Sequence, residues 1–146
     1  MRVAQLYDLS VAFEAITFET ADHREAVAFW RHQLDLEGEV TLLGSVPPDE
    51  VARQLDWADV FLHAATSEGF CNAVVEAQAH GVPVVCTDAD GLAENVEHDV
   101  TGLVVPRRDP AALAEAITRL AADGERRAAM GEAGPARVED VSLIDI

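Results

Sequence analysis

Segments with a strand pattern alternate along this chain with segments of helical pattern, and this alternation constrains the fold more than any other feature. Short apolar runs typical of strands fall at residues 13–18, 40–43, 58–62, 82–86 and 102–105. Helical periodicity and capping signals fall at residues 22–34, 48–55, 71–80, 91–97, 109–122 and 125–133. The alternation predicts a single α/β domain in which helices cover both faces of a parallel sheet. Ligands of such sheets bind beyond the carboxyl ends of the strands, so the segments that follow the strands form the candidate site.

The size and charge of the chain limit the classes of partner that it can bind. A length of 146 residues fits one domain, and 49% apolar residues are enough for a hydrophobic core. Acidic residues outnumber basic ones by 27 to 10, which gives a formal net charge of −17, and every basic residue is an arginine. This balance disfavours nucleic acids and anionic membrane surfaces as partners.

Cysteine usage and hydropathy favour a reducing compartment. Cys71 and Cys86 have neither a metal-binding spacing nor a CxxC pattern, so buried thiols are the expected form. No segment has the features of a signal peptide or the length of a membrane span. We therefore expect a cytoplasmic protein without a transmembrane segment, and a peripheral association with a membrane stays open.

The stretch at residues 67–77 carries most of the functional information. Glu68 precedes Gly69 and the start of a predicted helix, and Glu76 lies inside that helix. The helix N-terminus has unpaired amides and a partial positive charge, which suit a phosphate group. Ionised carboxylates only accept hydrogen bonds and therefore suit the hydroxyl groups of sugars. The combination predicts a nucleotide-sugar site, although either glutamate alone could be an ordinary charge on a helix surface.

An ordered series of motifs over residues 24–138 resembles the C-terminal, donor-binding domain of the family 4 retaining glycosyltransferases. The series comprises QLDLE at 33–37, VTLLGSV at 40–46, ADVFL at 58–62, SEGF at 67–70, GVPVV at 81–85, TGLVVP at 101–106 and DPAALA at 109–114. One pair of glutamates would be a weak signal, whereas this series in this order is specific. The resemblance implies one Rossmann-like domain, half of a GT-B architecture, that binds a nucleotide-sugar donor for transfer of a hexosyl group to an acceptor hydroxyl.

The resemblance also implies roles for individual residues. Glu68 corresponds to the glutamate at the transferred sugar, where it positions the donor and stabilises charge. Glu76 corresponds to the glutamate that holds the ribose hydroxyls. The other donor-binding positions are the loop on which the base stacks (Gly44, Ser45, Val46), the pocket-lining Thr66 and Ser67, the turn whose amides face the sugar and the diphosphate (Gly69, Phe70, Cys71, Asn72), and Glu94 in the next Gly-rich loop. No metal and no cofactor is implied, because the family is metal-independent and the nucleotide-diphosphate sugar is the substrate.

The chain departs from the family in its positive charges. Family members hold the diphosphate with an arginine and a lysine early in this domain, but this chain contains no lysine. The strand–helix unit that carries that pair is expected to be missing, as is the N-terminal acceptor-binding domain. Asp90 also stands where the family often has glycine. We expect weak donor binding by the isolated chain, because each lost charge-assisted hydrogen bond contributes roughly 1.5–3 kcal/mol.

Three functional hypotheses follow from these residues. The first is the donor domain of a glycosyltransferase, with activity of this chain alone left open. The second is a non-catalytic nucleotide-sugar-binding module or subunit that needs a separate acceptor domain. The third and weaker one is a nucleotide-sugar epimerase, which would need acid–base groups from two domains. An unpaired donor domain would expose the face that meets its partner, which favours self-association.

Several other side chains have less specific interpretations. His63 ends a predicted strand, where a packed or solvated histidine is a simpler interpretation than a substrate contact. Cys71 has no base nearby in the sequence and is expected to be inert. Arg107 follows a strand and is expected at the surface, whereas Trp30 and Trp57 are expected to fill the core.

Overall fold

The computed structural model describes residues 1–4, 25 and 27–144. The chain forms two units, and each is described by itself. The sheet unit consists of Met1–Tyr7 with Asp49–Ile146, and the N-terminal unit of Asp8–Pro48. The strand predicted at 13–18 lies outside the described residues.

The N-terminal unit is helical at residues 25 and 27–33, within the helix predicted at 22–34. Trp30, predicted in the core, is 59% exposed; its ring packs edge-on against that of Phe29, which is itself exposed. The prediction of a strand at 40–43 is also wrong. A strand needs a hydrogen-bonded partner, and the described part of this unit contains none.

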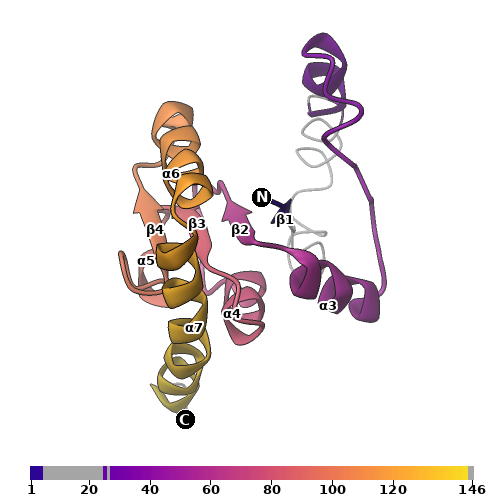
Figure 1. Ribbon diagram of the computed structural model, residues 1–146. Coiled ribbons are helices and arrows are strands. Elements are labelled where there is room, and N and C mark those ends of the chain that lie inside the picture. The colour runs from indigo at the N-terminus through magenta and orange to yellow at the C-terminus, as the bar shows by residue number, and fades with distance from the viewer. Residues whose placement is uncertain (5–24, 26, 145–146) are drawn as a thin grey trace. The chain divides into compact units, whose positions relative to one another are not determined.

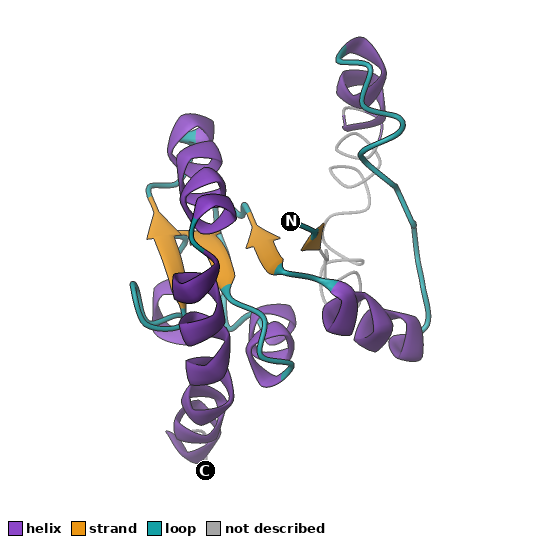
Figure 2. Cartoon of the chain, in the orientation of Figure 1, coloured by secondary structure: helices purple, strands orange, loops and turns teal. Residues whose placement is uncertain are grey.

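The sheet unit is built on four parallel strands, as Figure 2 shows in orange: β1 (Val3–Ala4), β2 (Val60–His63), β3 (Val84–Thr87) and β4 (Gly102–Val105). Their order in the sheet follows their order in the chain, β1-β2-β3-β4. The register aligns Val3 with Val60, Phe61 with Val84, and Val84 with Gly102. The predicted parallel sheet is therefore confirmed, whereas the short strand β1 had no clear signal in the sequence.

Five helices accompany these strands (Figure 1): α3 (Pro48–Trp57), α4 (Asn72–Ala79), α5 (Leu92–Asn95), α6 (Pro110–Ala122) and α7 (Gly124–Ile144). Successive residues of a strand point to opposite faces, so Phe61 and Val84 join one buried cluster and Val60 and Val85 the other. The first cluster includes Leu55, Val74 and Leu92, from α3, α4 and α5. The second includes Ala116, Leu120 and Met130, from α6 and α7. Helices therefore cover both faces of the sheet, as predicted.

Local signals set several helix ends. Asp109 caps α6, because its Oδ1 accepts a hydrogen bond of 3.0 Å from the amide of Ala112, and Pro110 occupies the first helical position. Gly81 ends the α4 segment with φ +70°, a conformation that favours glycine. Both ends agree with the sequence prediction.

Helix α7 is much longer than the segment predicted at 125–133. It continues through Pro135 to Ile144. Two glycines let it lie close to α4: a Cβ atom on Gly134 would come within 2.6 Å of the carbonyl oxygen of Gln78, and one on Gly131 within 2.3 Å of that of Gly81. Tertiary packing therefore stabilises a helix that its own glycine and proline residues would weaken.

Trp57 lies at the end of α3 and is 47% exposed, so the prediction of a core role is wrong. The guanidinium carbon of Arg2 lies 5.3 Å from the centre of its ring, within the range of a cation–π contact. Leu55, two residues earlier, is 1% exposed and supplies the apolar contact from this helix. No helix in the described residues is both long and apolar enough to span a membrane.

Candidate functional site

The loops that follow β2 and β3 are held tightly together at the carboxyl ends of the strands. The hydroxyl of Thr87 donates a hydrogen bond of 2.5 Å to the carbonyl of Ala65, and the amide of Gly91 donates one of 3.0 Å to the carbonyl of Glu68. A Cβ atom on Gly91 would lie 2.1 Å from the carbonyl oxygen of Gly69, so only glycine permits this approach. The loop that carries the predicted catalytic glutamate is therefore braced by its neighbour.

Glu68 is held by two donors from its own surroundings. Its Oε2 lies 3.0 Å from Nε2 of His63, and its Oε1 accepts a hydrogen bond of 3.2 Å from the amide of Gly69. The His63 side chain is 7% exposed and that of Glu68 is 32% exposed. The carboxylate is thus oriented by a buried residue and still reaches solvent. His63 is the packed histidine expected from the sequence, but its contact with Glu68 was not predicted.

The turn at the start of α4 keeps only part of the amide cluster that the sequence predicted. The amide of Cys71 donates a hydrogen bond of 3.1 Å to Oδ1 of the buried Asn95, and that of Gly69 is used by Glu68. The amides of Phe70 and Asn72 have no acceptor among the described residues. Phe70 is 48% exposed. Two amides at this helix start therefore remain available for an anion.

Cys71 has a base within reach, contrary to the expectation from the sequence. Its Sγ lies 3.7 Å from Nε2 of His63, the same atom that faces Glu68. His63 ends β2 and Cys71 immediately precedes α4, so the loop folds back between them. The sequence indicated this proximity only in that His63 and Cys71 lie at the two ends of one predicted loop.

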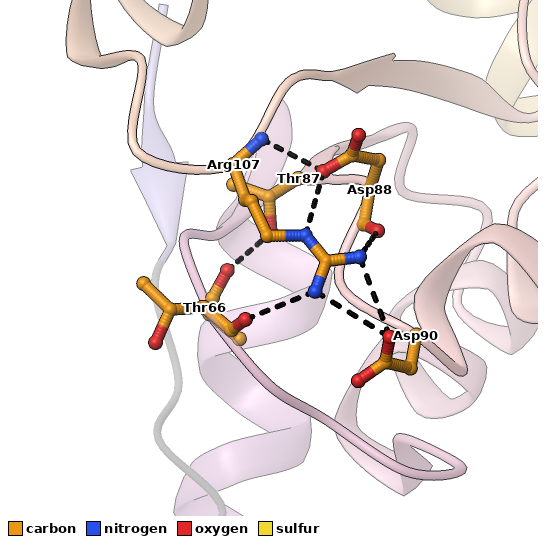
Figure 3. A network of polar contacts seen from close by, with 6 residues as sticks. Thr66, Thr87, Asp88, Asp90 and Arg107 are labelled. Carbon is orange, nitrogen blue, oxygen red and sulfur yellow. Dashed lines mark hydrogen bonds and ion pairs between the residues drawn. The ribbon is translucent and has the colours of Figure 1, made fainter.

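Arg107 forms a polar network at the same edge of the sheet (Figure 3). Its guanidinium pairs with Asp88 and Asp90, at 3.1 Å and 3.4 Å, and donates a hydrogen bond of 3.3 Å to the carbonyl of Thr66. It therefore links the loops that follow β2, β3 and β4. Hydrogen bonds from the Arg107 amide and guanidinium lower the pKa of Asp88, and the carboxylates raise the pKa of Arg107. Sequence reasoning expected an ordinary surface arginine and missed this link.

The other predicted donor-binding residues lie apart from these contacts. Glu76 is exposed on α4, and Glu94 is exposed on α5, where its carbonyl accepts a hydrogen bond from Arg137 of α7. Ser67 is an exposed loop residue. The base-stacking residues belong to the N-terminal unit, so their place in a donor pocket stays a prediction: Gly44 with φ +72°, Ser45 and Val46.

Comparison with known proteins gives the family of this fold and site. A sequence profile of the family described as glycosyl transferases group 1 matches residues 21–137. The chain belongs to this family. The resemblance found over residues 24–138 is thereby confirmed at the level of group 1.

Several similar proteins are bacterial glycosyltransferases. The amylovoran biosynthesis glycosyltransferase AmsK of Erwinia amylovora is 41% identical over 92 residues, which cover 59% of this chain and 23% of that protein. The D-inositol 3-phosphate glycosyltransferase of Corynebacterium urealyticum is 37% identical over 103 residues, 70% of this chain and 24% of that protein. The chain spans about a quarter of the length of these relatives.

Solved structures agree with this assignment. Sucrose-phosphate synthase from Thermosynechococcus elongatus superposes with a TM-score of 0.77 at 31% identity, over 82% of this chain and 30% of that one. Anabaena Alr3699/HepE in complex with UDP-glucose also gives a TM-score of 0.77, at 27% identity, over 84% of this chain and 34% of that one. The sheet unit thus has the architecture of one half of a GT-B enzyme.

Proposed function

We propose that this chain is the donor-binding domain of a glycosyltransferase that moves a hexosyl group from a nucleotide sugar to an acceptor hydroxyl with retention of configuration. The observation that carries the proposal is the braced loop at the start of α4. There a half-buried carboxylate, Glu68, stands beside the unengaged amides of Phe70 and Asn72. A similar solved structure, that of Anabaena Alr3699/HepE, contains UDP-glucose.

Each part of this site has a task in the proposed reaction. The amides at the start of α4 and the positive end of its dipole stabilise the departing diphosphate. Glu68 positions the sugar and stabilises the positive charge that develops at its anomeric carbon, and the acceptor hydroxyl attacks that carbon. Glu76 accepts hydrogen bonds from the ribose hydroxyls. Thr66, Ser67 and Glu94 line the donor pocket, and the stacking of the base on Gly44, Ser45 and Val46 stays a prediction from the sequence.

The charge at this edge supports weak donor binding. Arg107 is the cation beside the loops, but its guanidinium is already paired with Asp88 and Asp90. Loss of two charge-assisted contacts to the diphosphate would weaken donor binding by roughly a hundredfold to ten-thousandfold. We therefore propose that full activity needs a separate acceptor domain that brings further contacts.

Calorimetry with a panel of UDP-, GDP- and ADP-sugars tests the proposal on the full chain. We expect weak binding that prefers one base, and a loss of about tenfold or more in Glu76→Gln, because one charge-assisted hydrogen bond weakens. Glu115→Gln is the matched control, since Glu115 is an exposed helical glutamate without a proposed contact. No binding to any member would refute the donor site, and tight binding would refute the argument from the missing cations.

A non-catalytic nucleotide-sugar-binding module is the second candidate, and the paired state of Arg107 favours it. A transferase assay with and without a candidate acceptor domain separates the two. Turnover that appears only with the second domain supports a divided enzyme, whereas binding without turnover in either case supports the module. Self-association, and a cytoplasmic place with peripheral membrane contact, belong to the same proposal.

A further inference from the structure

Three side chains of different chemistry converge at the end of β2. They are the imidazole of His63, the carboxylate of Glu68 and the thiol of Cys71, and one donor atom of each lies within 4.8 Å of the other two. Nε2 of His63 is 3.0 Å from Oε2 of Glu68 and 3.7 Å from Sγ of Cys71. A single nitrogen thus faces both an oxygen and a sulfur.

These distances are close to those of a zinc centre. Tetrahedral Zn²⁺ has bonds of about 2.0–2.3 Å to nitrogen, oxygen and sulfur, which places neighbouring donor atoms about 3.3–3.6 Å apart. The two separations from Nε2 of His63 lie on either side of that range, within a few tenths of an ångström, and the oxygen of Glu68 and the sulfur of Cys71 lie within 4.8 Å of each other. We propose that His63, Glu68 and Cys71 bind a Zn²⁺ ion, with the fourth position open to water or another small ligand.

The surrounding residues hold two of the three ligands in place. Glu68 keeps its Oε1 on the amide of Gly69, which leaves Oε2 for the metal. The amide of Cys71 is fixed by Oδ1 of Asn95, and Asn95 in turn is held by Gln78 through a hydrogen bond of 3.1 Å to its carbonyl. Such outer contacts orient ligands and raise metal affinity. The site needs little rearrangement before the ion binds.

The second ring nitrogen of His63 can take up the ring proton when a metal binds. Without a metal, Nε2 faces the Glu68 carboxylate, which accepts a hydrogen bond from it. Nδ1 is buried and has no hydrogen-bond partner among the described residues, so the ring proton can move to Nδ1 when the ion takes the lone pair of Nε2. Zinc-binding histidines usually donate the second N–H to a protein group, so we expect an affinity below that of a closed structural zinc site.

The donor set favours zinc over the hard cations. A thiolate and an imidazole suit Zn²⁺, whereas Mg²⁺ and Ca²⁺ prefer sites made wholly of oxygen atoms. Binding requires the thiolate of Cys71, so one proton leaves the thiol for solvent as the sulfur–metal bond forms. The Glu68 side chain is 32% exposed and gives the ion a route from solvent. This inference shares Glu68 with the proposed donor site, so its tests measure metal binding and not transferase activity.

Substitution of Co²⁺ for Zn²⁺ makes the sulfur ligand visible. We expect the full chain, reduced and free of metal, to gain a sulfur-to-cobalt charge-transfer absorption when Co²⁺ is added, and Zn²⁺ to displace it at one equivalent. The absorption should disappear in Cys71→Ser and remain in Cys86→Ser. Cys86 is the matched control because it is the second cysteine of the chain, is fully buried in β3, and has a pKa raised to about 12 by that burial.

Two further measurements keep the test valid if Cys71→Ser fails to fold. Glu68→Gln changes a partly exposed side chain and should weaken Zn²⁺ binding at least tenfold while circular dichroism stays unchanged. In the unaltered chain, Zn²⁺ but not Mg²⁺ should raise the melting temperature and release protons that a pH indicator detects. Absence of the absorption in the unaltered chain, or its persistence in Cys71→Ser, would overturn the proposal.

Discussion

Two loops at the same edge of the sheet hold their charged groups in opposite ways. The loop between β2 and α4 holds the anion Glu68 with the buried His63 and a backbone amide. The loop after β4 holds the cation Arg107 between Asp88 and Asp90, whose side chains are 51% and 69% exposed. In the first loop, the buried Nδ1 atom of His63 has no hydrogen-bond partner among the described residues. In the second loop, no buried nitrogen of Arg107 lacks a partner.

The two loops should therefore respond differently to substitution: buried contacts hold the first, and exposed ion pairs hold the second. Buried polar groups are costly to disturb, because a lost partner leaves a group that water cannot reach. Exposed ion pairs contribute little to stability and are screened by salt. We therefore expect changes to the buried groups that brace the β2–α4 loop to affect folding and the site together. Changes at Arg107 should alter local charge with little effect on folding.

The largest effect should come from Gly91→Ala, which tests whether the β2–α4 loop is braced by its neighbour. The new Cβ atom would meet the carbonyl oxygen of Gly69 at 2.1 Å, so the two loops must separate. We expect a loss of about 3 kcal/mol in the free energy of unfolding, at the upper end of the usual effect of overpacking. Urea denaturation measures it. Gly69→Ala is the control, because nothing lies within 4 Å of its Cβ position. Equal losses in both variants would show that the loops are not braced.

Asn95→Ala should have the next largest effect, since it removes the buried acceptor of the Cys71 amide. Asn95 is 0% exposed, and its Oδ1 lies 3.1 Å from that amide nitrogen. A buried donor left without a partner costs about 1–3 kcal/mol, and we expect about 2 kcal/mol here. Thermal denaturation and hydrogen exchange at the Cys71 amide both report the change. Asn72→Ala, at an exposed position at the start of α4, should leave that amide protected. An equally protected amide in Asn95→Ala would contradict this account of the turn.

Arg107→Gln should have the smallest effect on stability and a clear effect on one pKa. Arg107 lowers the pKa of Asp88 from an ordinary value of 3.8, so the stabilising contribution of Asp88 is present above that pH. It is lost as the pH falls through the lowered pKa, where the carboxylate becomes protonated. An NMR titration of the Asp88 carboxyl should show its pKa rising toward 3.8 in the variant. Arg108→Gln, the adjacent exposed arginine, should leave it unchanged. An unshifted Asp88 in Arg107→Gln would show that the network does not form in solution.

Much of the sheet unit could be predicted from the sequence, because its signals are local. The predicted strand at 102–105 coincides with β4. The helix cap at Asp109 and the helix end at Gly81 also lie where the sequence predicted them. Strand β1 is only two residues long and forms a strand because it pairs with β2. Helix α7 passes Pro135 because glycines on one side allow close packing on α4. These departures follow from contacts between distant segments, which a local pattern does not contain.

The candidate site divides in the same way. The glutamate before a glycine and a helix start is a local motif, and Glu68 does lie at the carboxyl end of a central strand. The contacts of His63 with Glu68 and Cys71, and of Arg107 with three loops, arise only in the tertiary structure.

The sequence by itself therefore determined the family, the strand–helix alternation and the residue types at the carboxyl edge of the sheet, because each of these depends on a local pattern of neighbouring residues. Only the tertiary structure decided which amides at the start of α4 stay available and which carboxylates are already paired with Arg107. It also decided that Glu68 and Cys71 both lie beside Nε2 of His63. Hydrogen-bonding capacity is limited, so what a group can bind depends on the partners that folding has already brought to it.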